Sequence, residues 1–255
     1  MPDIRTRIPL VLVLCAAIGM LLHGPIAQLP HYHAFADQRM LLGLPHAADV
    51  LSNLGFLLVA AWGWRRLDAD MPNRLALRGW RLFLLALALT SLGSGWYHLA
   101  PDNARLIWDR LPIALACAGL LAAMRAETKG GGRCDAPLLA LAGIASVLWW
   151  QYTEQAGKGD LRPYLLLQTL PLVLIPLWQW IARAPRADRL LFGAAIGLYV
   201  AAKIAELQDS PILALTGILS GHTLKHLLAT LAAGLLVSRL AKGAQSSLAP
   251  AMPSS

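Results

Sequence analysis

Residues 80–99 read WRLFLLALALTSLGSGWYHL, a run in which apolar side chains predominate. About 17 to 25 such residues are long enough to cross the hydrocarbon core of a membrane as a helix. The run ends with a serine and a histidine that lie four residues apart, Ser94 and His98. On a helix this spacing places both side chains on one face. The stretch therefore predicts a transmembrane helix that carries two polar groups at one end.

The rest of the chain repeats this apolar character. Of its 255 residues, 57% are hydrophobic and 14% are charged, and the mean hydropathy is +0.54. Seven further apolar stretches lie at 8–24, 47–64, 106–124, 137–152, 163–182, 189–207 and 217–238. We therefore expect an all-α fold, a polytopic transmembrane helical bundle.

The basic residues indicate how these stretches are oriented. If all eight span, fifteen lysines and arginines fall on the side of residue 1 and five on the opposite side. Cytoplasmic loops carry the excess of positive charge, so we expect a cytoplasmic N-terminus. The net charge of +8 is thereby attributed to topology, and no nucleic-acid partner is expected. Short loops and the absence of an organelle signal favour a bacterial inner membrane.

The same map places several polar groups at the non-cytoplasmic face. His98 ends the third stretch, Asp109 begins the fourth, and His222 and His226 begin the eighth. His222 and His226 are again four residues apart, so they share one helix face. The topology map is drawn from hydropathy and charge alone, without regard to the histidines. Because it nevertheless places all of these polar groups at one face of the membrane, it predicts that they form one shared site.

These residue types can build a hydrolytic metal centre. A catalytic zinc ion has three protein ligands and an open position for water, and His98, His222 and His226 could supply the ligands. Asp109 would accept a proton from the water and return it to a leaving group. Ser94 could donate a hydrogen bond to a developing oxyanion. The pattern indicates a metal-assisted hydrolase at the membrane surface.

Each residue also has a purely structural interpretation. His98 could be a hydrogen-bonding residue between helices. Asp109 could cap a helix or pair with Arg105 or Arg110. Ser94, between two glycines, could simply permit close helix packing.

Other polar residues lie near these positions. The stretch 31–39 could support the site or form a solvated loop. Ser52 and Asn53, polar residues within an apolar run, should face other helices. Lys203 and Glu206 are three residues apart and could pair. The three cysteines are odd in number and form no CxxC motif, which argues against a disulfide framework.

Four elements together resemble the alkaline ceramidase family, part of a superfamily of seven-helix membrane hydrolases and receptors that includes the adiponectin-receptor-like proteins. The elements are SNLGFLL (52–58), SGWYHLAP (94–101), the aspartate eleven residues after His98, and HTLKH (222–226). The resemblance implies zinc bound by His98, His222 and His226, water activation by Asp109 and oxyanion stabilisation by Ser94. It implies a ceramide-like membrane lipid as the substrate, cleaved at its amide to a sphingoid base and a fatty acid.

The resemblance also divides the chain. Residues 1–44 would form an additional N-terminal helix and a polar loop, residues 45–241 the seven-helix core, and residues 242–255 a disordered tail. The eukaryotic members of the family carry an acidic, calcium-binding segment before the first core helix. Here that segment has few carboxylates beyond Asp37 and Asp49, which weakens the expectation of calcium.

Three other classes of protein remain open. The first is a seven-helix receptor or scaffold with a structural zinc and no turnover. The second is a b-type haem electron carrier with His98 and His222 as axial ligands. The third is a rhomboid-like serine protease built on Ser94, for which the surrounding residues match poorly.

Overall fold

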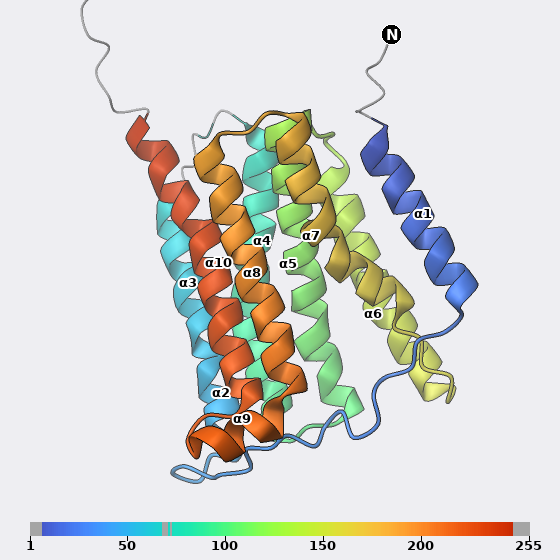
Figure 1. Cartoon of the computed structure of the whole chain (residues 1–255), viewed down its shortest axis with the longest axis vertical. Helices are drawn as coiled ribbons and strands as arrows, with labels where there is room; N and C mark the ends of the chain where they lie inside the picture. The colour runs from blue at the N-terminus through green and yellow to red at the C-terminus, as the bar shows by residue number, and fades with distance from the viewer. Residues whose placement is uncertain (1–6, 68–70, 72, 247–255) are drawn as a thin grey trace, which may run out of the picture.

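The computed structural model is a bundle of α-helices, and it describes residues 7–67, 71 and 73–246 (Figure 1). In chain order the helices are α1 (Ile8–His23), α2 (Ala47–Ser52), α3 (Leu54–Arg66), α4 (Arg74–Leu99), α5 (Asn103–Lys129), α6 (Asp135–Gln155), α7 (Arg162–Ile181), α8 (Arg186–Leu207), α9 (Asp209–Thr216) and α10 (Gly221–Ser246). The predicted all-α class is confirmed.

Six helical segments are long and apolar enough to cross a membrane, which defines a multi-pass integral membrane protein. They are Ala47–Arg66, Arg74–Leu99, Asn103–Thr128, Arg162–Ile181, Arg186–Leu207 and Gly221–Leu240. Helix α1 is shorter, at 16 residues, and it lies at the edge of the bundle against α7. Helix α6 has 21 residues but is not one of the six, so spanning by α1 and α6 stays a prediction.

The long helices run alternately up and down in Figure 1. The start of α1 and the end of α10 therefore lie at one end of the bundle. The end of α4 and the starts of α2, α5 and α10 lie at the other. The grouping of the polar residues in the sequence assumes that successive helices run in opposite directions, and the long helices of the fold do so.

Two predicted stretches differ in detail from the helices that form. The stretch 47–64 is two helices, because a turn at Asn53 separates α2 from α3. The Asn53 side-chain amide donates to the Asp49 carbonyl at 2.7 Å, which stabilises this break. The stretch 217–238 begins at Gly221 instead, since Gly217, with φ +68°, ends α9.

Close packing of α4 on α5 sets the position of the polar residues. A Cβ atom at Gly93 would overlap the carbonyl of Trp108, and one at Gly79 would overlap the backbone of Ala123. Only glycine permits this approach, as is common where membrane helices cross. The contact at Gly93 holds the turn of α4 that carries Ser94 against the turn of α5 that carries Asp109.

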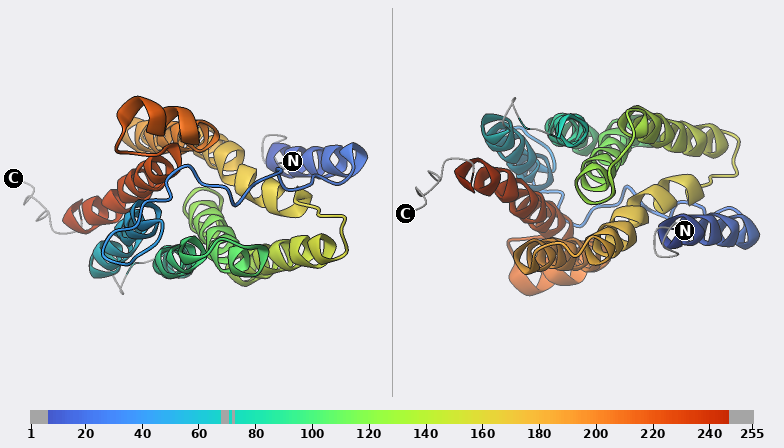
Figure 2. Two further views of the ribbon diagram at one scale, coloured as in Figure 1. Left: turned by 90° about the horizontal axis from the view of Figure 1, so that it is seen from below. Right: turned by 90° about the horizontal axis from the view of Figure 1, so that it is seen from above.

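Residues 24–46, which we call the strap, cross the end of the bundle where the histidines lie (Figures 1 and 2). The backbone of Ile26 pairs with Leu161, and the amide of Ala36 donates to Asp209 at 2.9 Å. Arg39 donates to the carbonyls of Gly217 and Ile218. Its hydrogen bond to Asp37 lowers the pKa of that carboxyl group, so the ion pair persists at neutral pH. The strap is a packed element, held at several points.

The predicted tail begins within the last turns of α10 and otherwise stays a prediction. Helix α10 continues to Ser246, past the predicted start of the tail at residue 242. Residues 247–255 and Arg5 are outside the described residues.

Candidate metal centre

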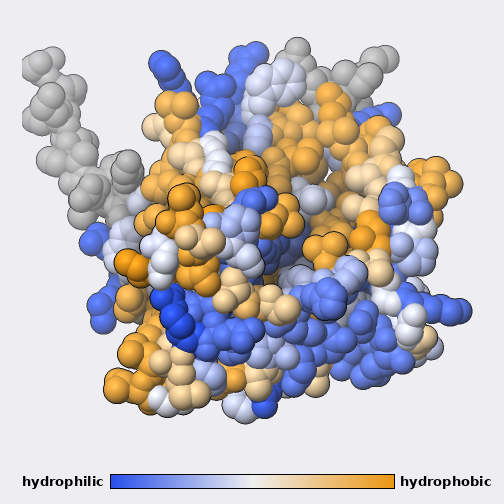
Figure 3. Space-filling model, turned by 60° about the horizontal axis from the view of Figure 1, so that its bottom comes forward, coloured by the Kyte–Doolittle hydropathy of each residue, from blue (hydrophilic) through white to orange (hydrophobic). Residues whose placement is uncertain are grey.

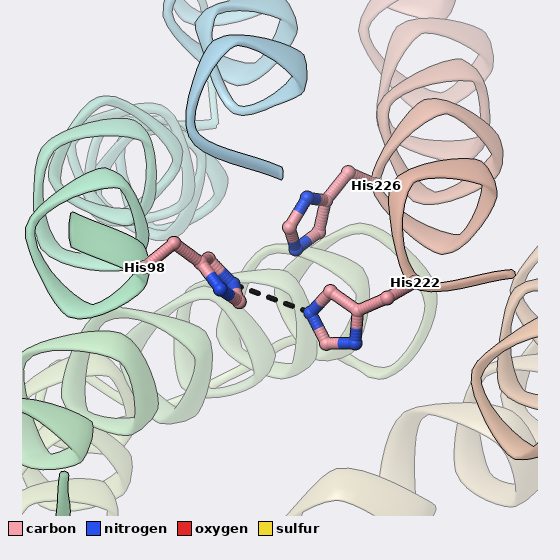
Figure 4. A group of neighbouring side chains, drawn as sticks. All are labelled: His98, His222 and His226. Atoms are coloured by element: carbon pink, nitrogen blue, oxygen red, sulfur yellow. Dashed lines mark hydrogen bonds between the residues drawn. The ribbon is translucent and has the colours of Figure 1, made fainter. Parts of the chain in front are cut away.

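Three buried histidines converge at the strap-covered end of the bundle (Figure 4). His98 comes from the last turn of α4, and His222 and His226 come from the first two turns of α10. One ligand nitrogen from each lies within 4.8 Å of the others, so the three residues could hold a metal ion. They are brought together by segments more than a hundred residues apart in the chain.

The spacing fits a zinc ion. Zinc–nitrogen bonds of about 2.0–2.1 Å at a tetrahedral angle place two ligand nitrogens roughly 3.3 Å apart. The Nε2 atoms of His98 and His222 lie 3.2 Å apart. His98 Nδ1 is buried and has no hydrogen-bond partner within the part of the chain that the structure describes. One pair of nitrogens thus has the spacing of zinc ligands, and three imidazoles are the donor set of some catalytic zinc sites.

Polar groups on neighbouring helices orient the third imidazole. Ser52 Oγ lies 2.8 Å from His226 Nδ1, and the Asn53 amide lies 3.4 Å from the same nitrogen. With Nδ1 engaged, Nε2 is left to face the other histidines, the arrangement typical of metal-ligating histidines. The prediction that Ser52 and Asn53 face another helix is confirmed, and the break at Asn53 is what turns them toward His226.

A phenylalanine that the sequence analysis missed closes the cluster on the strap side. The Phe35 ring centroid lies 4.7 Å from that of His98 and 4.3 Å from that of His222. Nearby, His33 Nδ1 lies 2.8 Å from the Tyr97 hydroxyl. Phe35 therefore packs over the cluster, whereas His31, Ala34, Gln38 and Arg39 of the same stretch are exposed, so each of the two interpretations of 31–39 holds for part of it. No periodicity marks Phe35, because strap residues have no repeating face.

Ser94 and Asp109 line the same cavity as His226. Asp109 lies six residues inside α5, and the residue that caps this helix is Asp102, whose carboxylate accepts from the Arg105 amide at 2.7 Å. The cap interpretation of Asp109 is therefore wrong. Among the described residues Asp109 has no ion pair, since Arg105 pairs with Asp102 and Arg110 lies over the Trp150 ring at 4.0 Å.

Of the two glycines that flank Ser94, one makes the close helix contact that the packing interpretation requires. Gly93 meets α5 closely, whereas a Cβ at Gly95 would meet nothing within 4 Å. Close packing and a polar role for Ser94 are thus compatible, because the glycine makes the contact and the serine lines the cavity.

The cavity has a volume of about 210 Å³ and mostly apolar walls. Beyond the polar end, its lining residues come from α3, α4, α5, α7, α8 and α10 and include Phe56, Phe83, Leu87, Leu120, Ile175, Phe192, Ile196 and Leu236. Lys203 also lines it and leaves 47% of its side chain exposed, so the cavity reaches the molecular surface there. Figure 3 shows hydrophilic residues over the middle and right of the lower end, hydrophobic residues at its left and over much of the flanks, and a hollow near the middle.

A charged group lies between this opening and the histidines. Glu206 accepts from Lys203 at 2.8 Å, which confirms the predicted pair, and from Lys225 at 2.9 Å, which was not predicted. Lys225 Nζ also lies 3.1 Å from His222 Nε2. Lys225 stands inside the HTLKH motif, but only the fold shows that it meets Glu206 of α8.

The two strap-side aspartates have separate partners. Asp37 is held by Arg39, and buried Asp49 accepts from the Thr223 hydroxyl at 2.6 Å. Asp209 accepts from the amide of His222 at 2.8 Å, which ties α9 to the start of α10.

Comparisons of the chain with models of protein families, with curated proteins and with solved structures found no match. The fold and the site together define a multi-pass helical membrane protein with a buried cluster of three histidines that could hold a metal ion.

Proposed function

We propose that the protein is a zinc-dependent integral membrane amidase of the alkaline ceramidase type. It would hydrolyse the N-acyl amide of ceramide-like lipids to a sphingoid base and a fatty acid. The observation that carries the proposal is that His226, one of the three clustered histidines, lines an apolar cavity whose wall also holds Asp109 and Ser94.

The histidines and the polar side chains of the cavity would have separate roles in the reaction: metal binding, proton transfer and stabilisation of the oxyanion. His98, His222 and His226 would hold the zinc ion, which would supply Lewis-acid chemistry toward water and the amide carbonyl group. Asp109 accepts a proton from the attacking water and returns it to the amine nitrogen as the C–N bond breaks. Ser94 donates a hydrogen bond to the oxygen that gains charge.

The shape of the cavity supports an acyl-lipid substrate. Along α4 the lining runs from Ser94 back to Phe83, and eleven residues of helix span about 16 Å. Walls of this kind exclude water and accommodate a hydrocarbon chain. Phe35 covers the histidines on the strap side, while Lys203 marks an opening on the flank, so the lipid would enter from the membrane.

A receptor or scaffold with structural zinc is the main alternative. Structural zinc sites are closed by four protein ligands, whereas catalytic sites keep one position open. A cluster of three histidines, one of which, His226, lines a cavity, favours the catalytic interpretation. The haem alternative is disfavoured, because Nε2 atoms 3.2 Å apart leave no room for a macrocycle between them.

The proposed location follows from charge and alternation. Basic residues concentrate at the end of the bundle where α1 begins, which would be cytoplasmic. The metal centre would then face the non-cytoplasmic side of a bacterial inner membrane.

Metal analysis combined with a hydrolysis assay tests the proposal. Purified protein should contain about one zinc per chain, and His222→Ala or His226→Ala should lose most of it, because two ligands make a poor site. Removing zinc with a chelator should abolish hydrolysis of a fluorescent ceramide, and adding zinc should restore it. Full zinc retention in both variants would exclude the three-histidine centre. Zinc binding without turnover of any N-acyl lipid would favour the scaffold.

A further inference from the structure

Two lysines share one carboxylate beside the metal centre. Glu206 Oε2 accepts from Lys203, and Glu206 Oε1 accepts from Lys225, at 2.8 and 2.9 Å. One carboxylate cannot neutralise two ammonium groups, so this group of three side chains, the Lys203–Glu206–Lys225 triad, carries a surplus positive charge. Within an apolar bundle an ionisable group is costly and usually marks a path for a ligand.

The two ammonium groups are placed to meet a ligand in the cavity. Both Lys203 and Lys225 line it, Lys203 at the opening on the flank and Lys225 further in. Lys225 Nζ lies 3.1 Å from His222 Nε2, next to the histidine cluster. An anion held by both lysines would therefore lie between the opening and the reacting amide.

We propose that the triad recognises an anionic oxygen group, a carboxylate or a phosphate, on the amine half of the N-acyl lipid. The inference rests on the proposed amidase function and narrows its substrate class to anionic N-acyl lipids. In the reaction, the oxygen of water bonds to the acyl carbon, the C–N bond breaks, and the amine nitrogen takes a proton. The anionic group keeps its charge throughout and only positions the lipid.

The chemistry of lysine suits this role. Its ammonium group is a compact point charge with three donors, which binds a carboxylate or phosphate oxygen without demanding a planar partner. A hydrogen bond to a charged group contributes about 1.5–3 kcal/mol, which corresponds to roughly ten- to a hundredfold in kcat/KM. A neutral lipid would bring no anionic partner to the two ammonium groups, and Asp109, the other carboxylate of the cavity, forms no ion pair with either lysine among the described residues.

The test compares three substrates with the same dodecanoyl chain: a neutral ceramide, its 1-phosphate and an N-acyl glycine. The zinc-loaded protein should prefer at least one anionic substrate by about tenfold or more in kcat/KM. Lys203→Gln should remove that preference, while Lys203→Arg, which keeps the charge, should retain most of it. Lys158→Gln, which changes an exposed lysine of the α6–α7 loop, is the matched control.

Comparing kcat/KM for the 1-phosphate with kcat/KM for the N-acyl glycine identifies whether the triad prefers a phosphate or a carboxylate. Equal kcat/KM for all three substrates would overturn the proposal, as would a Lys203→Gln variant that loses activity equally toward all of them. In the latter case the lysine acts on the reaction itself.

Binding is read separately from turnover by thermal stabilisation. Dodecanoyl-glycine should raise the melting temperature of the wild type more than dodecanoyl-ethanolamide does, and Lys203→Gln should abolish that difference. If no substrate is hydrolysed but the difference in melting is present, the amidase proposal fails and the anion site stands. If hydrolysis occurs without any such difference, the amidase stands and the anion site fails.

Discussion

The position of Asp109 in the fold distinguishes its two interpretations, a helix cap and a proton acceptor in catalysis. Helix α5 is capped by Asp102, so an aspartate seven residues further on contributes nothing to that cap. Its side chain is only 8% exposed and lines the cavity that holds His226. A buried carboxylate in an apolar wall is costly, and the proposed role in proton transfer would account for its presence.

We expect Asp109→Asn to keep its fold and its zinc but to lose activity by about a hundredfold or more, the usual contribution of general acid–base catalysis. Ser94→Ala should cost less, about one oxyanion hydrogen bond or somewhat below. The measurement is ceramide hydrolysis by purified, zinc-loaded variants. Asp102→Asn is the control, because asparagine also caps helices well. A near wild-type rate in Asp109→Asn would leave that residue without a role in the reaction.

Ser52 is expected to act through His226. Removing a hydrogen bond that orients a metal-ligating histidine typically costs ten- to a hundredfold in metal affinity, and Ser52 Oγ lies 2.8 Å from Nδ1. Ser52→Ala should therefore weaken zinc binding by about that factor in a competition titration. Ser238→Ala, whose hydroxyl donates to its own helix at the carbonyl of Leu235, should bind zinc as the wild type does. Equal affinities in both variants would show that Asn53 and packing alone hold the imidazole.

At the scale of elements, the contact of α4 with α5 depends on one glycine. We expect Gly93→Ala to destabilise the protein by about 1–3 kcal/mol, because its Cβ overlaps the backbone of Trp108 and the two helices have to move apart. Zinc content should fall as well, since α4 carries His98. Gly95→Ala, two residues away with nothing within 4 Å of its Cβ, should be neutral or slightly stabilising. The comparison is made by melting temperature and metal analysis, and similar melting of the two variants would contradict the packing argument.

The strap is expected to control access of solutes to the metal centre. Phe35 packs on the rings of His98 and His222, so Phe35→Ala should open the cluster to water and speed zinc removal by a soluble chelator several-fold. Leu42→Ala changes a fully exposed residue of the same strap and should leave that rate unchanged. If Phe35→Ala loses zinc at the wild-type rate, the chelator reaches the site by another route.

Hydropathy and spacing predicted the helices and the grouping of the histidines, because both depend on local periodicity and on alternation across a membrane. The break at Asn53 could not be predicted this way, since a single turn leaves the apolar run uninterrupted. The contact of Phe35 with the histidines and that of Lys225 with Glu206 depend on how distant elements pack. One sequence holds no signal for such contacts.

At the scale of the whole molecule, the alternation of the helices makes a prediction about sidedness. Cys134, at the start of α6, and Lys158, in the α6–α7 loop, are both exposed and lie at opposite ends of α6. In a background without other cysteines, Lys158→Cys should label from outside the cell with an impermeant reagent, and Cys134 should not. The reverse pattern would invert the orientation and place the metal centre on the cytoplasmic side.

The covered lower end and the opening on the flank have a consequence for kinetics. A ligand that arrives sideways is drawn from the lipids around the protein, so its relevant concentration is a mole fraction within a two-dimensional phase. Adding inert detergent at constant molarity of substrate should then slow the reaction in proportion to surface dilution. Adding buffer, which changes molarity but not the composition of the micelle, should leave the rate per protein molecule nearly constant.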